Sequence, residues 1–196
     1  MGVGCSKMKF LGSKVLLTER LILRPVTLSD TPTMYINWQS DERVTKYLSW
    51  KPYPSLEYSY EVSKNWISRY SNYDFFLWLI VEKETNIPIG TIGIGHYASD
   101  WSSAEVGYCL GYKWWGKGYA TEALKIVSSF LLNKVKIPEL TCCCDRENLA
   151  SARVMEKAGY KFRSVKKDFK VREDYICDIL VFYMKRESFI DKIKNK

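Results

Sequence analysis

A glycine-rich segment contains the residues best suited to bind an anion. Gly111, Gly116 and Gly118 follow the half-apolar run Glu105–Leu110 and directly precede a helical pattern. Glycines let the backbone approach a ligand closely, and the first turn of a helix presents N–H groups that carry partial positive charge and have no intrahelical partner. The segment therefore predicts an anion site, most naturally for phosphate, at the start of a helix.

Three kinds of phosphate site compete for this segment. The run from Gly111 to Lys117 has the G-x-x-x-x-G-K pattern of a P-loop, but Gly118 stands where that loop needs Ser or Thr to hold Mg²⁺. A dinucleotide site with Asp145 as the ribose ligand lacks its third glycine, and only about one βαβ unit follows where that fold needs two halves. The third kind is a coenzyme A pyrophosphate site.

Three sequence blocks resemble one enzyme family and favour the third kind. The run Trp115–Ala120, WGKGYA, resembles the Q/R-x-x-G-x-G/A signature of the GNAT N-acetyltransferase superfamily. The run Asn148–Tyr160 resembles the N-x-x-S-x-x-x-x-E-K-x-G-[FY] block of its RimJ/RimL-type branch, and Thr18–Pro25 is similar to the first strand of that branch. The blocks have the order found in the family and cover most of the chain.

The resemblance implies an α/β (α+β) GNAT fold. Its mixed central sheet is expected to have about six to seven strands, with a parallel βαβ unit at the cofactor site and helices on both faces. One domain is expected over residues 15–186, after a flexible extension over 1–14 and before a charged tail over 187–196. No linker or internal repeat divides the chain.

Hydrophobic periodicity predicts the elements that would position these blocks. Strands are expected at 16–26, 75–82, 87–96, 105–110, 139–145, 160–168 and 175–185, and helices at 30–39, 55–70, 117–133 and 149–158. The strand, helix and strand from 105 to 145 form a right-handed crossover, so these two strands are expected to be parallel. Asn148 is expected to cap the last helix, and Gly159 to end it.

The resemblance assigns roles in binding acetyl-CoA, the implied co-substrate. Backbone amides at the helix start would bind the pyrophosphate, and main-chain groups at the end of the preceding strand would pair with the pantetheine arm. Trp115 stands where the family has Gln or Arg, so no phosphate contact is expected from its side chain. The expected coenzyme residues are Cys109, Leu110, Tyr112, Trp115, Gly116, Lys117, Gly118, Tyr119, Ala120, Thr121, Asn148 and Ser151.

Two residues are expected to move protons. Glu105 would take a proton from the acceptor amine, directly or through water, and its alternative is a sheet carboxylate paired with a basic residue. Ser151 matches the acid proposed in this branch for the leaving thiolate, because Met155 stands where many family members have a tyrosine. An α-amine of pKa ~8 is partly neutral at pH 7, so a weak base suffices for it.

The acceptor is expected on the side covered by the helices at 30–39 and 55–70. His96, Trp38 and Tyr53 are candidate acceptor-binding residues, with structural packing as the alternative for each. The branch resemblance implies a protein N-terminal α-amine, such as that of a ribosomal protein. The alternatives are a small amine, an amino acid or an antibiotic as acceptor, or a non-catalytic regulator that binds acyl-CoA.

Composition narrows the classes of partner. The chain has 196 residues, 46% of them hydrophobic, and no apolar run approaches the ~20 residues of a membrane span, so no membrane partner and a cytoplasmic location are expected. The net charge of +8 favours acidic partners, and a basic nucleic-acid-binding module is one rival function. No long basic run supports sequence-specific binding of nucleic acid. The sequence does not fix the oligomeric state, and a homodimer is compatible with it.

Two further patterns concern metal binding and acylation. The six cysteines have no spacing suited to zinc, and the consecutive Cys142–Cys144 would point to opposite faces of a strand, so no metal is expected. They are typical of small core residues in a reducing compartment. Met1–Ser6 matches the myristoylation pattern M-G-x-x-x-[ST], and its alternative is an unstructured start of the chain.

Overall fold

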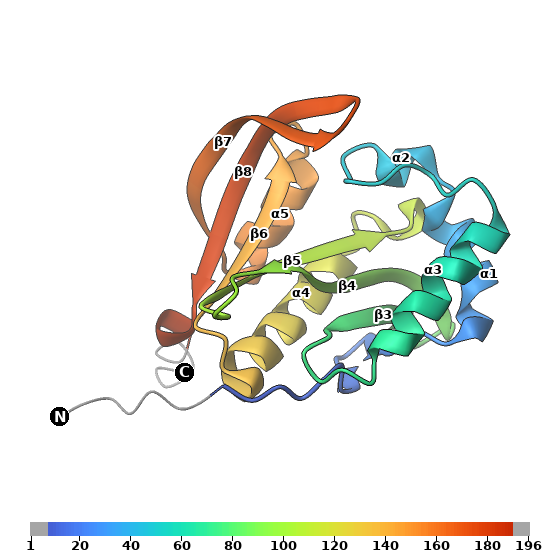
Figure 1. Cartoon of the computed structure of the whole chain (residues 1–196), viewed down its shortest axis with the longest axis horizontal. Coiled ribbons are helices and arrows are strands. Elements are labelled where there is room, and N and C mark those ends of the chain that lie inside the picture. The colour runs from blue at the N-terminus through green and yellow to red at the C-terminus, as the bar shows by residue number, and fades with distance from the viewer. Residues whose placement is uncertain (1–7, 190–196) are drawn as a thin grey trace.

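One mixed sheet runs through the whole domain, as the computed structural model shows for residues 8–189 (Figure 1). Over these residues the sheet has eight strands in the order β1-β2-β3-β4-β5-β6-β8-β7. Only β5 and β6 are parallel, and every other neighbouring pair is antiparallel. The strands are β1 (Leu16–Leu17), β2 (Leu21–Arg24), β3 (Leu77–Glu82), β4 (Ile87–Tyr97), β5 (Ser103–Leu110), β6 (Glu139–Asp145), β7 (Lys161–Arg172) and β8 (Tyr175–Lys185).

Helices cover both faces of the sheet. The α-helices are α1 (Thr31–Met34), α2 (Glu42–Thr45), α3 (Leu56–Arg69), α4 (Tyr119–Phe130) and α5 (Leu149–Ala158). Short 3₁₀ turns occupy Leu28–Asp30 and Tyr112–Trp114, and α1 and α4 each continue into a π-helical turn, Tyr35–Gln39 and Leu131–Val135.

Strand alternation divides the core into two layers. On β3, Trp78 and Ile80 are fully buried in the main core with α4 and α5, whereas Leu79 and Val81 pack with Trp38 on the side of α1. Successive side chains of a strand point to opposite faces, so one central strand supplies both layers. This confirms the expected GNAT-type architecture with helices on both faces.

Three expectations about elements were wrong. The stretch 16–26 forms two strands because the Thr18 hydroxyl accepts a bond of 2.9 Å from Leu21 N–H and closes a turn, which raises the strand count to eight. The helix expected at 30–39 is a mixture of 3₁₀, α and π turns. Strand β7 continues to Arg172, and it stays paired with β8 although bulges shift the register along its length.

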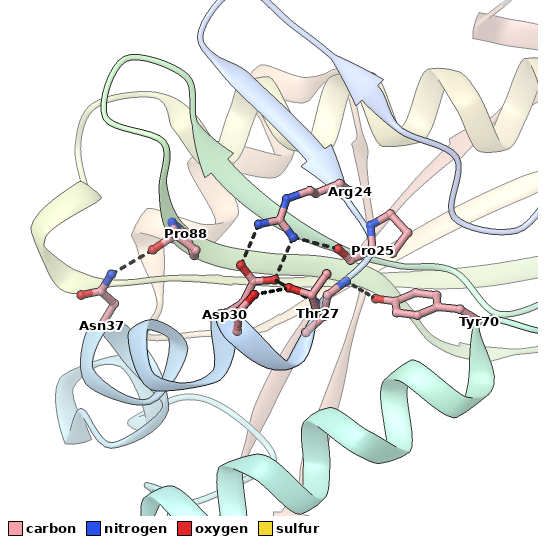
Figure 2. A network of polar contacts seen from close by, with 9 residues as sticks. Arg24, Pro25, Thr27, Asp30, Asn37, Tyr70 and Pro88 are labelled. Atoms are coloured by element: carbon pink, nitrogen blue, oxygen red, sulfur yellow. Dashed lines mark hydrogen bonds and ion pairs between the residues drawn. The ribbon is translucent and has the colours of Figure 1, made fainter.

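A partly buried ion pair fixes the first helical turns against the sheet (Figure 2). Arg24, at the end of β2, donates bonds of 2.8 and 2.6 Å to the two oxygens of Asp30, which also accepts from Thr27 N–H. Burial alone would raise the pKa of Asp30, but the bonds from Arg24 and Thr27 outweigh it and lower that pKa. Asn37, in the π-helical turn after α1, donates to the Pro88 carbonyl of β4, so a hydrogen bond also joins this helical segment to a central strand of the sheet.

The ends of the described chain pack on the domain. Residues 8–14 were expected in a flexible extension, but Lys9 N–H bonds the Val135 carbonyl and Gly12 N–H bonds the Tyr73 carbonyl. Phe189 packs on the main core near the other end. The segment Met1–Ser6 lies outside the described residues. No helix within residues 8–189 has the length and apolar character needed to cross a bilayer.

Candidate active site

The site forms where two parallel strands separate. β5 and β6 pair only at their starts, where Ser103–Glu105 lies beside Glu139–Thr141. Beyond that point β5 stays paired with β4, and β6 stays paired with β8 as far as Asp145. Figure 1 shows the two arrows diverging, with the β7–β8 hairpin and α2 at the wide end. The facing edges of both strands are therefore available to a ligand.

The helix that begins beside this opening lacks a side-chain cap. Gly118 is the N-cap residue of α4, with φ of +82°, and no side chain bonds the first-turn N–H groups. Gly116 also has positive φ, +75°, and a Cβ built on it would have no atom within 4 Å. The first-turn N–H groups of a twelve-residue helix therefore remain for an anion, as a pyrophosphate site requires.

Two polar anchors hold the start of α4. The Tyr119 hydroxyl donates to Glu82 Oε1 in the core, and that bond lowers the pKa of Glu82. Glu122 accepts from the Thr18 hydroxyl at 2.6 Å and from Arg20 Nε at 2.8 Å. Burial would raise the pKa of Glu122, but these bonds lower it. The loop geometry is therefore fixed by the protein before any ligand binds.

Arg20 is a candidate residue of the phosphate site that no sequence motif indicates. Its Nη1 donates to the Lys117 carbonyl at 3.0 Å, and its guanidinium lies 4.5 Å from the centre of the Tyr119 ring. Its Nη2 is 3.5 Å from a Cβ built on Gly118. Local motifs do not reveal this contact, because Arg20 and Lys117 are almost a hundred residues apart in the chain. It adds positive charge at the predicted phosphate position.

The exposed edge of β5 presents only alternate main-chain groups. Gly111 N–H bonds the Ile89 carbonyl of β4, so alternation along the strand also directs the main chain of Cys109 toward β4. Cys109 is therefore no main-chain partner for a ligand in the opening, which corrects the sequence expectation. The carbonyl of Leu110 points to the opposite edge, where the indole N–H of Trp115 donates to it at 2.8 Å. Tyr112 and Trp115 are themselves about half exposed.

The expected base lies at the narrow end of the opening. Glu105 is the cross-strand partner of His96 on β4, and Cys143 Sγ donates to its Oε2 at 3.4 Å. His96 is exposed, and no hydrogen bond from it to Glu105 is present. Two residues further along β5, a Cβ built on Gly107 would meet no atom within 4 Å. The structure thus brings Glu105 and His96 together beside an open patch of sheet.

The expected acid lies on the other side of the opening. Ser151, in the first turn of α5, donates its N–H to the side chain of the N-cap residue Asn148 at 3.1 Å. The Tyr108 hydroxyl from β5 lies 2.9 Å from Ser151 Oγ and 3.2 Å from its carbonyl oxygen. Burial raises the pKa of Tyr108, so its phenol stays protonated. No sequence motif indicates Tyr108, because its partner Ser151 belongs to a separate element.

The two candidate acceptor-binding residues from the helical region between β2 and β3 differ in how far their side chains are exposed. Trp38 is 1% exposed and belongs to the second core layer, so it forms no wall of the opening. Tyr53 is partly exposed, with its ring 5.1 Å from that of Trp50 and 5.0 Å from that of Tyr58. Burial raises its pKa. The packing alternative therefore holds for Trp38, while Tyr53 belongs to an aromatic cluster that continues toward the surface.

Among residues 8–189, no group of three or more His, Cys, Asp or Glu side chains is placed to hold a metal ion. Cys142 and Cys144 are buried in the core, and Cys143 is partly exposed on the opposite face. The alternation of a strand produces this arrangement.

Comparison with known proteins identifies the family. A sequence profile described as "Acetyltransferase (GNAT) domain" matches residues 20–161. The chain belongs to the GNAT acetyltransferase family. A curated relative, "Uncharacterized N-acetyltransferase p20" of Bacillus licheniformis, is 28% identical over 177 residues, which cover 89% of this chain and 98% of the relative.

Solved structures of acetyltransferases share this fold. A GNAT-family acetyltransferase from Bacillus anthracis superimposes with a TM-score of 0.78 at 23% identity, covering 89% of this chain and 99% of that one. The ribosomal L7/L12 α-N-protein acetyltransferase RimL in complex with coenzyme A has a TM-score of 0.76 at 17% identity, covering 88% and 98%. At these identities the likeness shows the fold alone.

The protein is thus an acyl-CoA-dependent N-acetyltransferase, and acetyl-CoA is its co-substrate. The residues present fit this GNAT co-substrate. The uncapped N-terminus of α4 offers N–H donors to a pyrophosphate, and the unpaired edge of β5 offers main-chain groups to an amide-containing arm. Asn148 uses Oδ1 as a helix cap, so only its Nδ2 remains to bind that arm.

Proposed function

We propose that this GNAT enzyme acetylates the N-terminal α-amine of a protein, as RimJ/RimL-type enzymes do. One observation supports this proposal above all. The carboxylate residue Glu105 lies in the last cross-strand pair of β5 with β6, and the hydroxyl residue Ser151 bonds Tyr108 further along β5, so the two residues flank the strand opening near the uncapped start of α4. The RimL likeness in fold and the three RimJ/RimL-like sequence blocks add support for the branch.

The proton transfers follow from the two side chains. Bound acetyl-CoA supplies the thioester carbonyl carbon, to which the amine nitrogen forms its new bond as the carbon–sulfur bond breaks. Glu105, directly or through water, accepts the proton that the attacking nitrogen loses. Ser151 passes a proton to the departing thiolate and takes a replacement proton from solvent water, and the protonated phenol of Tyr108 orients the Ser151 hydroxyl. The α-amine needs only a weak base because its pKa, ~8, lies near neutrality.

The amide edge of β5 complements these proton transfers. The N–H groups of Tyr108 and Leu110 point into the opening by strand alternation, since Gly111 and Cys109 point to β4. A main-chain N–H at this position is suited to stabilise negative charge that develops on a carbonyl oxygen. We assign the oxyanion role to this edge rather than to a charged side chain.

The proposal includes a cytoplasmic location. Cys109, Cys142, Cys143, Cys144 and Cys177 are free thiols in the structure, which is typical of a reducing compartment. A homodimer stays a prediction.

A thiol-release assay with acetyl-CoA tests the function. The acceptors are a peptide with a free N-terminal amine, an N-blocked peptide with one lysine, and a polyamine, and fragment masses locate the acetyl group. We expect release with the first peptide and acetylation of its α-nitrogen. Acetylation of lysine or polyamine alone would refute the acceptor assignment. Coenzyme binding without thiol release from any amine, free amino acids included, would indicate a non-catalytic regulator.

A further inference from the structure

A cationic pocket lies at the wide end of the strand opening. It has a volume of about 510 Å³ and lies between α2 with its following loop and the β7–β8 hairpin. Its lining residues are Glu42, Arg43, Thr45, Lys46, Lys51, Pro52 and Arg172. None of them belongs to α4 or α5, the helices that carry the coenzyme residues, so the mechanism leaves this pocket without a role.

Contacts connect the pocket to both strands that border the opening, β5 and β6. Arg43 places its guanidinium 4.1 Å from the ring centre of Tyr112, directly after β5. On the other wall, Arg172 donates to the Leu48 carbonyl at 2.7 Å and lies over the ring of Tyr175, whose hydroxyl donates to Asp145 at the end of β6. A molecule in this pocket is therefore beside the opening and on the side of the helical cover.

The lining carries more positive than negative charge. Four of the lining residues are cations, and one, Glu42, is a carboxylate. Arg43 is paired with Asp41 at 2.6 Å, and Asp174 is paired with both Lys51 at 2.6 Å and Arg172 at 3.2 Å. Among residues 8–189, no carboxylate lies within 4.0 Å of Lys46 Nζ, although the charges of Asp145 and Glu147 act on it from a greater distance. Lys46 is therefore the lining cation that remains available for a direct ion pair with a ligand.

We propose that this pocket binds a carboxylate that the acceptor carries close to its amine, with Lys46 as the principal contact. The inference rests on the proposed function and specifies its acceptor. In a protein acceptor the carboxylate belongs to an acidic side chain near the N-terminus, and in a small acceptor it is the carboxylate of an amino acid. The same charges disfavour polyamines, because like charges in a shared pocket repel each other.

Matched acceptor pairs test the proposal. One pair is a peptide beginning Ala-Glu-Glu and its Ala-Gln-Gln counterpart, and the other is β-alanine and β-alaninamide. In wild-type enzyme we expect kcat/KM for the acidic member of at least one pair to exceed that of the neutral member about ten-fold. The pair that shows the preference identifies the source of the carboxylate.

Two variants assign the effect to the pocket. In Lys46→Ala the preference for the acidic member should fall to about two-fold or less, with KM for acetyl-CoA unchanged. Lys64→Ala is the control, because Lys64 is an exposed lysine on α3 paired with Glu61, outside the pocket. It should keep the preference. A higher KM for acetyl-CoA in Lys46→Ala, with the preference intact, would overturn the proposal and assign the pocket to coenzyme phosphate.

A binding measurement separates this inference from the proposed function. With coenzyme A present, titration calorimetry compares the N-acetylated Glu-Glu and Gln-Gln peptides and N-acetyl-β-alanine with its amide. Tighter binding of an acidic ligand to wild type than to Lys46→Ala would support the pocket even if no acceptor turned over. Equal binding within both pairs would overturn the inference, whereas the thiol-release result alone decides the function.

Discussion

The two ends of the β5–β6 pair have opposite roles. At the paired end, Ala104 and Leu140 are cross-strand partners and both are at most 1% exposed. At the separated end, the same strands give up mutual hydrogen bonds and carry Tyr108 and Asp145, whose polar groups bond to α5 and to β8 instead. Backbone groups without a strand partner need another partner, which a ligand provides. The paired end therefore stabilises the fold, whereas the separated end is the proposed substrate site.

The separated end is possible because both strands have other partners. β6 remains paired with β8 over its full length, and β5 remains paired with β4 as far as its last residue, Leu110. Each strand therefore keeps one ladder when it loses the other. The separation therefore removes few backbone hydrogen bonds, and the pairing with β4 and β8 holds the two separated strands in place.

The largest expected effect is on stability at the paired end. Leu140→Ala removes a fully buried side chain from the main core and should lower the free energy of unfolding by about 3 kcal/mol. Chemical denaturation measures this change. Coenzyme A affinity of the folded fraction should remain within about two-fold, because Leu140 lies in the paired part of β6 and its side chain is buried in the main core. A large loss of affinity would break the distinction between the two ends.

Gly118→Val should lower the affinity for coenzyme A. A side chain at this left-handed N-cap, φ +82°, blocks approach to the α4 amides and should raise the Kd of coenzyme A about 100-fold, equivalent to about 2.7 kcal/mol. Calorimetric titration measures it. Gly12→Val is the matched control, because Gly12 also has positive φ, +66°, and lies outside the site. It should bear similar backbone strain and keep the affinity, and unchanged affinity in Gly118→Val would refute the pyrophosphate assignment.

Asp145→Ala tests the separated end of β6 through pH. Burial would raise the pKa of Asp145, but bonds from the Tyr175 hydroxyl and Glu147 N–H lower it below its ordinary value of 3.8. Ionised Asp145 therefore stabilises the fold above pH 3.8, and this stabilisation is lost as pH falls through the lowered pKa. Denaturation at pH 7 should show a loss of about 1.5 kcal/mol in the variant.

The difference between wild type and Asp145→Ala should shrink when the pH falls well below 3.8. Tyr175→Phe removes the main bond that lowers the pKa and should weaken the pH dependence. A difference that stays constant from pH 7 to pH 3 would show that packing, and not ionisation, gives Asp145 its effect.

The smallest effect is expected from Tyr108→Phe, which removes the hydroxyl that orients Ser151. We expect kcat to fall about five-fold, close to 1 kcal/mol, with KM for acetyl-CoA unchanged. In a Ser151→Ala background the same substitution should have almost no effect, because a positioning residue acts only through its partner. Equal effects in both backgrounds would mean that Tyr108 acts independently of Ser151.

Much of the fold could be predicted from local patterns. Asn148 caps α5, and Gly159 ends it with φ of +98°, both as expected, because caps depend on a few neighbouring residues. The parallel relation of β5 and β6 followed from the crossover rule. The split of the first strand could not be predicted, because the bond from Leu21 N–H to Thr18 competes with a continuous strand that has the same apolar alternation.

The candidate site was only partly accessible to such reasoning. Local motifs located the start of α4, and they placed Glu105 and Ser151 on elements that do face each other. They gave no sign of Arg20, Tyr108 or the cationic pocket, whose partners lie far away in sequence. They also suggested Cys109 as a main-chain partner, because the direction of a strand's N–H groups depends on which neighbour it pairs with.

Neighbouring residues alone account for the glycine-rich start of α4, the strand alternation and the helix caps, since each depends on backbone preferences within a few residues. Contacts between distant segments set where β5 and β6 separate, which edge of β5 stays open and which cations line the pocket with Lys46. These properties arise from hydrogen-bond register and packing between distant segments. Residue types alone leave that register undetermined.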